Sequence, residues 1–377
     1  MHFDFTEDEL AFQEAARRVS ADVLKANAAR YDDTRDFCSE SLRALGELGF
    51  WSMNLSSEYG GVDISSIGMS LAVEEIAYHC AATCSSLTAH FLATDSVLVG
   101  GTEEQKQALL PQCAAGEKLG AFALTEPGAG SNPAEMRTKA VRNEQGWHIT
   151  GTKHYITNGA FADFLVVYAK TDEDLGHRGI SAFLVDRDTA GLAFSQPEKT
   201  LGLRGSHIYE IGIDCVVPDN ALLGEEGAGF ATAMEVLDRG RVEVAAMSVG
   251  ISRAAYDDTL AWSHDRVVSG KPLCRHQGIQ WMLAEMHAQL EAAKLVTYKA
   301  AAARDSGQRF SLESAVAKLF ASEAAAKVTD QAVQIHGGYG YISDLPIERY
   351  YRDARITRIF EGTSEIQKII IGRAITA

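Results

Sequence analysis

The chain has 377 residues, of which 46% are hydrophobic and 23% charged, and this predicts an ordinary globular protein of two or three domains. Its formal net charge of -16 disfavours general attraction to nucleic acid or to an anionic membrane surface. The start, MHFDFTEDEL, lacks the features of a signal peptide, and no run of about 18 apolar residues occurs. We therefore expect a cytoplasmic protein without a membrane span.

The six cysteines are too few for a disulfide framework in a chain of this length. Cys80 and Cys84 lie one helical turn apart, but no further Cys or His set stands at metal-binding spacing. Small buried side chains are the favoured interpretation, and no metal site is expected.

Residues 1–117 are predicted to form an N-terminal α-helical domain. They are rich in Ala, Leu and Glu, and Pro111 is the only proline among them. Thr6 stands three residues before Glu9, which is the capping-box pattern at a helix start.

Residues 118–224 are predicted to form a middle β domain. Short β-branched or aromatic runs such as WHITGTKHYITNG, DFLVVYAKTD and IYEIGIDCVVP alternate with turn residues, including Asn158-Gly159. The regular spacing predicts a compact antiparallel barrel or sandwich.

Residues 225–377 are predicted to be helical again. The apolar residues Ile279, Met282, Leu283, Met286 and Leu290 recur at helical intervals, and an Ala-rich segment containing Val316, Leu319 and Phe320 ends at Gly337-Gly338. Several such helices with short connections predict an antiparallel bundle, so the fold class expected for the whole chain is α+β multidomain.

Two motifs in the middle domain could hold a ligand. The loop TEPGAGSN, Thr125 to Asn132, would let backbone N–H groups approach an anion, although a plain tight turn uses the same residues. In KHYITNG, Tyr155 and Thr157 stand two residues apart, so a strand would place them on one face that could line a flat ring or simply pack across strands. No G-x-G-x-x-G follows a strand, which makes nicotinamide a poor candidate.

Three motifs in the C-terminal third remain ambiguous on their own. The glycines of IHGGYGY either cap a helix or admit a ligand, and DRGRVEVAAMSVG is expected to open a helix whose arginines bind a phosphate or form surface ion pairs. In RIFEGTSEIQ, Glu361 follows Ile359 and Phe360 and precedes Gly362. This carboxylate is either a solvated helix end or a functional group in apolar surroundings.

The order of these motifs resembles the acyl-CoA dehydrogenase family. TEPGAGS, GTKHYITNG, GISAFLV, LGLRGS, LLGEEGAGF, QIHGGYGY and RDARITRIFEGTSEIQ occur in this order over nearly the whole chain. The resemblance implies an N-terminal helical domain, a middle β domain and a C-terminal four-helix bundle, usually in a homotetramer. It also implies FAD as the cofactor, oxidation of an acyl-CoA to the trans-2-enoyl-CoA, and an electron-transferring flavoprotein as acceptor.

The resemblance also implies roles for individual residues. Glu361 corresponds to the base that removes the α-proton while the β-hydrogen leaves as hydride to flavin N5. The residues that correspond to FAD contacts are Phe122, Leu124, Thr125, Gly130, Ser131, Tyr155, Thr157, Arg266, Gln277, Gln334, Gly338, Thr363 and Glu365. Of these, Arg266, Gln277, Gln334 and Gly338 correspond to residues that reach a neighbouring subunit's FAD. Substrate contacts are implied for Ser131, Asp238, Arg241 and Gly362.

The chain departs from the family pattern in two places. Ser269 replaces an aromatic residue that packs near the flavin phosphates in many relatives, which predicts weaker FAD binding. His90, Thr94 and Asp95 lie where relatives build part of the acyl pocket, and they indicate either an unusual acyl group or ordinary satisfied polar residues. An alternative substrate is an acyl thioester on a carrier protein. No Lys or Arg occurs between Ala44 and Gln105, so we expect neutral acyl chains rather than dicarboxylyl groups.

Overall fold

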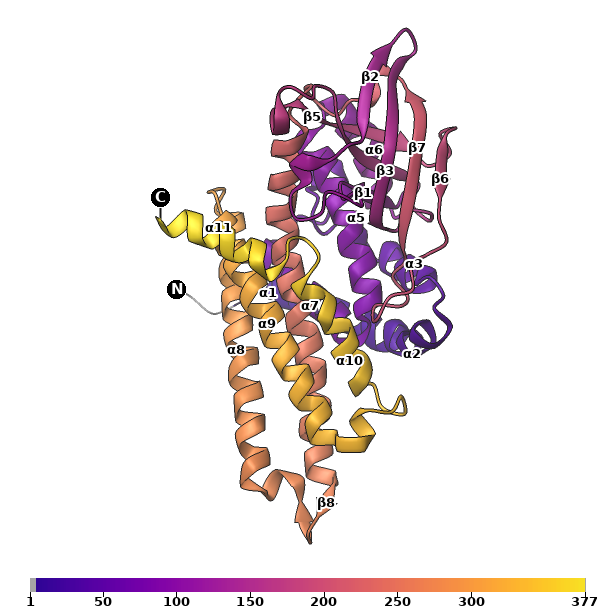
Figure 1. The fold of residues 1–377 in the computed structure, drawn as a ribbon. Coiled ribbons are helices and arrows are strands. Elements are labelled where there is room, and N and C mark those ends of the chain that lie inside the picture. Colours follow the sequence, from indigo (N-terminus) through magenta and orange to yellow (C-terminus); the bar gives the residue numbers. More distant parts are fainter. Residues whose placement is uncertain (1–4, 377) are drawn as a thin grey trace.

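The computed structural model describes residues 5–376, which form the three expected regions (Figure 1). The N-terminal helices are α1 Glu7–Val19, α2 Lys25–Thr34, α3 Ser39–Glu47, α4 Ser66–His79, α5 Ala81–Gly100 and α6 Glu103–Ala114. The capping box is confirmed, because Thr6 N–H donates to Glu9 Oε2 at 2.8 Å and Glu9 N–H donates to Thr6 Oγ1 at 3.2 Å.

The middle region is a seven-stranded sheet. Its strands are β1 Gly120–Ala123, β2 Lys139–Asn143, β3 Gly146–Thr157, β4 Phe164–Lys170, β5 Ile180–Asp186, β6 Leu192–Phe194 and β7 Ile208–Val217. The sheet order is β1-β4-β2-β3-β7-β6, with β5 pairing with β4. The pairs β2–β3, β3–β7, β6–β7 and β4–β5 are antiparallel as predicted. Strand β4 additionally pairs parallel with β1 and β2, which the long connections between these strands permit.

A β-bulge interrupts β3 beside the predicted ligand face. The β3–β7 register shifts between Lys153 and Ile156, and Tyr155 has a φ of 57°. Simple alternation therefore fails at this point, as is usual where one strand has an extra residue. Ile156 is buried, whereas Tyr155 before it is 57% exposed and Thr157 after it is half-buried.

The C-terminal region contains three long helices, α7 Gly229–Asp265, α8 Gln277–Asp305 and α9 Ser311–His336, and two shorter ones, α10 Ile347–Ala354 and α11 Ser364–Thr376. A small hairpin, β8 Val267–Val268 with β9 Lys271–Pro272, joins α7 to α8 at one end of the bundle (Figure 1). The short α10 packs against α7 and α9 as the fourth helix. The predicted end of α9 at Gly337 is confirmed. The expectation that DRGRVEVAAMSVG opens a helix is wrong, since these residues lie inside α7.

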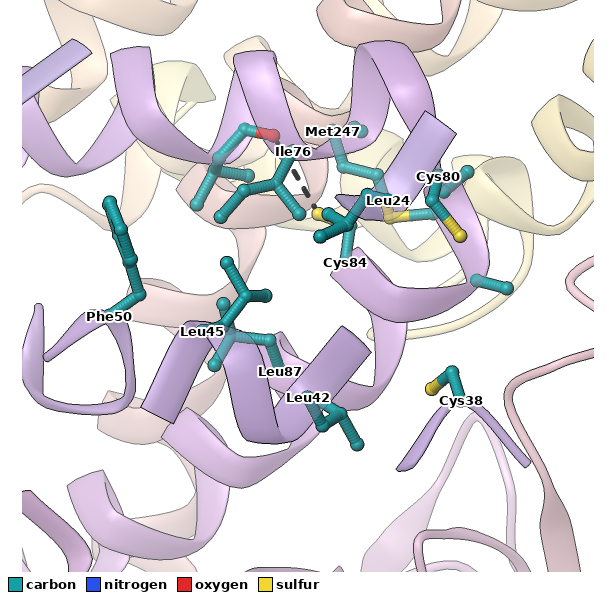
Figure 2. Packing of buried hydrophobic residues seen from close by; sticks show 14 of the residues in the cluster. Leu24, Cys38, Leu42, Leu45, Phe50, Ile76, Cys80, Cys84, Leu87 and Met247 are labelled. Atoms are coloured by element: carbon teal, nitrogen blue, oxygen red, sulfur yellow. Dashed lines mark hydrogen bonds between the residues drawn. The ribbon is translucent and has the colours of Figure 1, made fainter. Parts of the chain in front are cut away.

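A large apolar core joins the N-terminal helices to the bundle. Leu24, Leu42, Leu45, Ile76 and Leu87 pack with Met247 of α7, as Figure 2 shows. Cys80 and Cys84 are buried in the same cluster, in agreement with their interpretation as small core residues, and Cys38 is buried there as well. Among residues 5–376, no helix is both long enough and apolar enough to cross a bilayer.

Candidate active site

The Glu361 loop lies between a 3₁₀ turn at Arg355–Arg358 and the start of α11. Glu361 has a φ of 51° and Gly362 a φ of 94°. A left-handed conformation is natural for glycine but costs a glutamate on the order of 1–3 kcal/mol, and strain of this kind is concentrated at functional sites. Gly362 thus permits the second half of a turn that holds Glu361 in an unusual orientation.

Gly240 makes room for the Glu361 side chain against α7. A Cβ atom on residue 240 would lie 2.2 Å from Oε2 of Glu361 and 2.7 Å from Cδ2 of Leu92 on α5. Both distances are too short for real contacts, so only glycine fits here without movement of the carboxylate. The Glu361 carboxylate is therefore enclosed between α7 and an apolar side chain of α5.

One oxygen of the Glu361 carboxylate has no hydrogen-bond partner in the part of the chain that the structure describes. Its Oε2 is buried, and nothing within residues 5–376 donates to it. Burial raises the pKa of Glu361 to about 7, although the positive charges of Lys318 and Arg241 oppose this shift. A carboxylate whose pKa lies near neutral pH is suited to act as a general base.

Cations and anions alternate around this carboxylate. Arg241 on α7 is 5% exposed and forms an ion pair with Asp238, which also accepts a hydrogen bond from Ser311 Oγ on α9. Lys318 on α9 donates from Nζ to the carbonyl oxygen of Gly362 at 2.6 Å. Arg241 is almost fully buried, so it does not face an exposed phosphate. Its predicted contact with substrate stays a prediction, and that contact would involve the acyl end of the ligand.

A second polar group lies farther along the same helices. Asp95 on α5 is fully buried, and its Oδ1 accepts from Asn54 Nδ2 at 3.0 Å and from Arg239 Nη1 at 3.4 Å. Arg304 on α8 lies 3.9 Å from Asp95 Oδ2 and 3.4 Å from Glu243 Oε1. The segment between Ala44 and Gln105 has no Lys or Arg of its own, but α7 and α8 bring Arg239 and Arg304 beside Asp95. Both arginines already face carboxylates.

The predicted flavin residues of the β domain lie together. The Thr125 carbonyl accepts a hydrogen bond from the His154 N–H at 2.8 Å, which places the TEPGAGSN loop beside Tyr155. A buried ion pair reinforces this contact, since Lys153 Nζ lies 2.8 Å from Glu126 Oε1. Gly130 and Ser131 are exposed, Phe122 is half-buried and Leu124 is buried.

A second set of predicted flavin residues lies at the far end of the bundle. Arg266 and Gln277 flank the β8–β9 hairpin, and Gln334 and Gly338 lie at the end of α9, at the opposite end of the molecule from the sheet (Figure 1). The Arg266 guanidinium lies 5.6 Å from the centre of the Tyr339 ring. Within one chain, the two sets of predicted flavin residues therefore lie far apart. They could contact the same FAD only if a second copy of the chain placed the end of its bundle against the first copy's sheet.

Both sets have properties that suit FAD. An added Cβ at Gly130, Gly337 or Gly338 would meet no atom within 4 Å, so a ligand can approach the backbone there. Arg266 forms no ion pair within residues 5–376, which leaves its charge for a phosphate. Near Glu361, Thr363 caps α11 by accepting from the Ile366 N–H at 3.3 Å, and Glu365 is exposed.

Sequence reasoning missed three residues that shape the site: Gly240, Lys318 and Lys153. Gly240 was visible in DRGRVEV as a glycine inside a helix, which usually has a packing reason. The two lysines gave no signal, because a lysine in an Ala-rich or strand segment is normally exposed.

Comparisons with known proteins agree with this architecture. Models of the acyl-CoA dehydrogenase N-terminal, middle and C-terminal domains match residues 6–117, 121–216 and 227–376. A short-chain specific acyl-CoA dehydrogenase from Clostridium acetobutylicum is 39% identical over 377 residues, with 100% of both chains covered.

Solved structures give the same result. The butyryl-CoA dehydrogenase from Megasphaera elsdenii superposes with a TM-score of 0.98 at 39% identity and covers 100% of both chains. A chain in a structure of the electron transferring flavoprotein of Acidaminococcus fermentans gives 0.98 at 39% identity, covering 100% of this chain and 99% of that one. The chain belongs to the acyl-CoA dehydrogenase family of FAD-dependent oxidoreductases.

Proposed function

We propose that this protein oxidises a short, neutral acyl-CoA thioester to the trans-2-enoyl-CoA, with Glu361 as the base. The observation that carries the proposal is the Glu361 carboxylate, whose buried Oε2 has no partner among residues 5–376 and whose pKa is raised to about 7 by burial. A partner-free carboxylate can accept a proton without first breaking a hydrogen bond or an ion pair. FAD, when bound, supplies the acceptor for the hydride that leaves the β-carbon.

The backbone of Glu361 would stabilise the developing negative charge. No hydrogen bond within residues 5–376 uses the Glu361 N–H, so this group is free to donate to the thioester oxygen. An α-proton next to a thioester is weakly acidic, and a positioned donor at the oxygen lowers the barrier to its removal. The carboxylate oxygen Oε2 is buried against α7 at Gly240, and its loss of hydration strengthens the carboxylate as a base.

Several finer features belong to the same proposal. We place FAD against the loop and strand residues Phe122, Leu124, Thr125, Gly130, Ser131, Tyr155 and Thr157, with Thr363 and Glu365 nearby. Arg266, Gln277, Gln334 and Gly338 would come from a second copy, which agrees with a homotetramer. An electron-transferring flavoprotein as acceptor and a cytoplasmic location complete the proposal.

The acyl group is proposed to be short and neutral. Named relatives include a short-chain specific enzyme and a butyryl-CoA enzyme. Near the base, Arg239 and Arg304 already face Asp95 and Glu243, so neither is an unopposed cation for a distal carboxylate. A carrier-protein thioester is the second candidate, and it has less support because both of these relatives act on CoA thioesters.

A product screen tests the proposal. Purified protein should be yellow with about one FAD per chain, and it should convert butyryl-CoA or another short neutral acyl-CoA to its 2-enoyl product with an artificial electron acceptor. Butyryl thioester on an acyl carrier protein and glutaryl-CoA serve as comparisons. A colourless protein that takes up no added FAD would contradict the cofactor. Turnover confined to the carrier-protein substrate would contradict the CoA thioester, and fastest turnover with glutaryl-CoA would contradict the neutral acyl group.

A further inference from the structure

Lys318 is a fully buried lysine that the reaction as described above does not use. It lies on α9, where Ala315, Ala317 and Ala321 are also fully buried. An ammonium group is seldom buried without a compensating partner, because it loses its hydration. Lys318 forms no ion pair within residues 5–376, and its Nζ donates one hydrogen bond there, to the Gly362 carbonyl oxygen at 2.6 Å.

The acceptor of that hydrogen bond belongs to the strained turn that presents Glu361. Gln367 Nε2 donates to the same Gly362 oxygen at 2.9 Å and to the Glu361 oxygen at 3.3 Å. Two side chains from different helices therefore hold the two peptide groups that flank Gly362. Because Glu361 and Gly362 both have positive φ angles, the turn needs such external support to persist.

We infer that Lys318 is a positioning residue for Glu361: it holds the Gly362 peptide in place, and its charge stabilises the ionised Glu361 carboxylate without touching the substrate. The inference rests on the proposed function of Glu361 as the base. It assigns to a lysine of α9 the two tasks of fixing the loop and setting the strength of the base.

Lys318 is the positive charge with the largest effect on the pKa of Glu361. Burial raises the pKa of Glu361 to about 7, and the largest opposing effect comes from Lys318, followed by Arg241 of α7. Burial lowers the pKa of Lys318 to about 8, and the charge of Glu361 opposes this.

Other charged residues surround this pair. Glu243 of α7 interacts with Glu361 as a further acid, while Glu323 of α9 and Glu365 of α11 have smaller effects on Lys318. Arg241 is already compensated by its ion pair with Asp238, whereas Lys318 forms no ion pair within residues 5–376.

Two neutral substitutions separate the two tasks. Lys318→Met removes both the charge and the hydrogen-bond donor, whereas Lys318→Gln removes the charge and keeps an amide that can donate to the Gly362 carbonyl. The readout is the rate at which butyryl-CoA bleaches the flavin of the loaded enzyme in a single turnover without oxygen, measured from pH 5.5 to 9. Lys294→Met is the control, since that lysine is paired with Glu291 on α8.

Loss of a nearby opposite charge typically raises a carboxyl pKa by about one unit or more. We expect the midpoint of the pH profile to move upward by about that amount in both Lys318 variants and to stay in place in Lys294→Met. The plateau rate at high pH should fall more in Lys318→Met than in Lys318→Gln. Lower rates with an unmoved midpoint in both variants would mean a structural role alone and would overturn the inference.

A second readout needs no flavin chemistry. The difference in unfolding free energy between each Lys318 variant and the same variant carrying Glu361→Gln follows the ionisation of Glu361 with pH. Its midpoint should move upward together with the kinetic one, and an unchanged midpoint would again contradict the inference. If Lys318→Met does not fold, Lys318→Gln gives the same decision. Failure of the proposed function looks different, because the wild type would then bleach with a pH profile that does not depend on Glu361.

Discussion

Helix α7 contributes to two groups of charged residues in the interior. They differ in whether every carboxylate oxygen has a close hydrogen-bond or ion-pair partner. In the first, Arg253 Nη2 lies 2.6 Å from Glu75 Oε2 and Arg253 Nη1 lies 2.7 Å from Glu74 Oε1, while Tyr298 Oη donates to Glu74 Oε2 at 2.8 Å. Every carboxylate oxygen of this group has a close partner. The second group surrounds Glu361 and meets α7 at Gly240, about three helical turns before Arg253. Among residues 5–376, Glu361 Oε2 has no hydrogen-bond or ion-pair partner.

The pKa values follow this pairing for Glu75 but not for Glu74, whose pKa is raised by burial although both of its oxygens have partners. Burial acts to raise the pKa of Glu75, but the hydrogen bonds and charges of Arg253 and Arg17 hold it below its ordinary value. For Glu361 burial dominates, and the pKa rises to about 7. The comparison teaches that burial alone does not identify a catalytic carboxylate. Glu361 differs from Glu74 and Glu75 in having a buried oxygen without a donor within residues 5–376. Glu243 also has such an oxygen, and Glu361 differs from it in lying on a strained turn against Gly240.

The largest expected effect is that of Glu361→Gln on turnover. Glutamine has nearly the same volume and keeps the backbone N–H, but it cannot accept the α-proton. We expect steady-state turnover of butyryl-CoA to fall by about 10²- to 10⁴-fold, with FAD content unchanged. Glu104→Gln, which changes an exposed carboxylate of α6, should keep wild-type turnover. Near-normal turnover in Glu361→Gln would assign the base to another residue.

Next in size is the effect of Arg253→Met on stability. Removing this guanidinium leaves two buried carboxylates without their main partner, which typically costs about 3–5 kcal/mol. Urea unfolding of the flavin-loaded protein measures the loss. Arg18→Met, which removes an exposed pair with Glu14, should change stability by less than about 0.5 kcal/mol. Turnover per folded protein should stay normal in both variants; a selective loss in Arg253→Met would end the distinction between the two groups.

Gly240→Ala should lower turnover by about 10²-fold, because the new methyl group would displace the carboxylate by a fraction of an ångström or more. An alanine in a helix is otherwise favourable by roughly 1 kcal/mol, so stability is not expected to explain the loss. Gly372→Ala in α11 is the matched control, since no atom lies within 4 Å of its added Cβ. Equal turnover in both variants would show that Gly240 does not constrain Glu361.

A smaller effect concerns stability and pH. Because the Glu361 pKa is higher in the folded protein than the usual value of about 4.3, the folded state binds the proton more tightly. This contribution to the unfolding free energy is fully present below the pKa of the unfolded carboxyl group. It is lost as the pH rises through about 7, the pKa of Glu361 in the folded protein. Relative to Glu361→Gln, the wild type should therefore lose on the order of 1–3 kcal/mol between about pH 4.5 and 7.5. Parallel stability curves for the two proteins would contradict the raised pKa.

The sequence was sufficient to predict the three regions, because the period of the apolar residues changes from helical to strand-like and back. Through the ordered motifs that resemble the family, it also predicted Glu361 as the candidate base. It could not predict the bulge at Tyr155 or the parallel pairing of β4, which depend on contacts between distant segments. Nor could it place Arg239 and Arg304 beside Asp95, since no local pattern reports which helices meet in a bundle.

The pH dependence of flavin bleaching in the wild type tests the central claim most directly. Butyryl-CoA would be mixed with the flavin-loaded enzyme without oxygen, and the first-order bleaching rate followed from pH 5.5 to 9. A base with a pKa of about 7 predicts a rate that rises about tenfold per pH unit in the acid range and levels off above neutral pH. A rate that stays constant from pH 5.5 to 9 would show that no group with such a pKa removes the proton, and Glu361 as described here would not be the base.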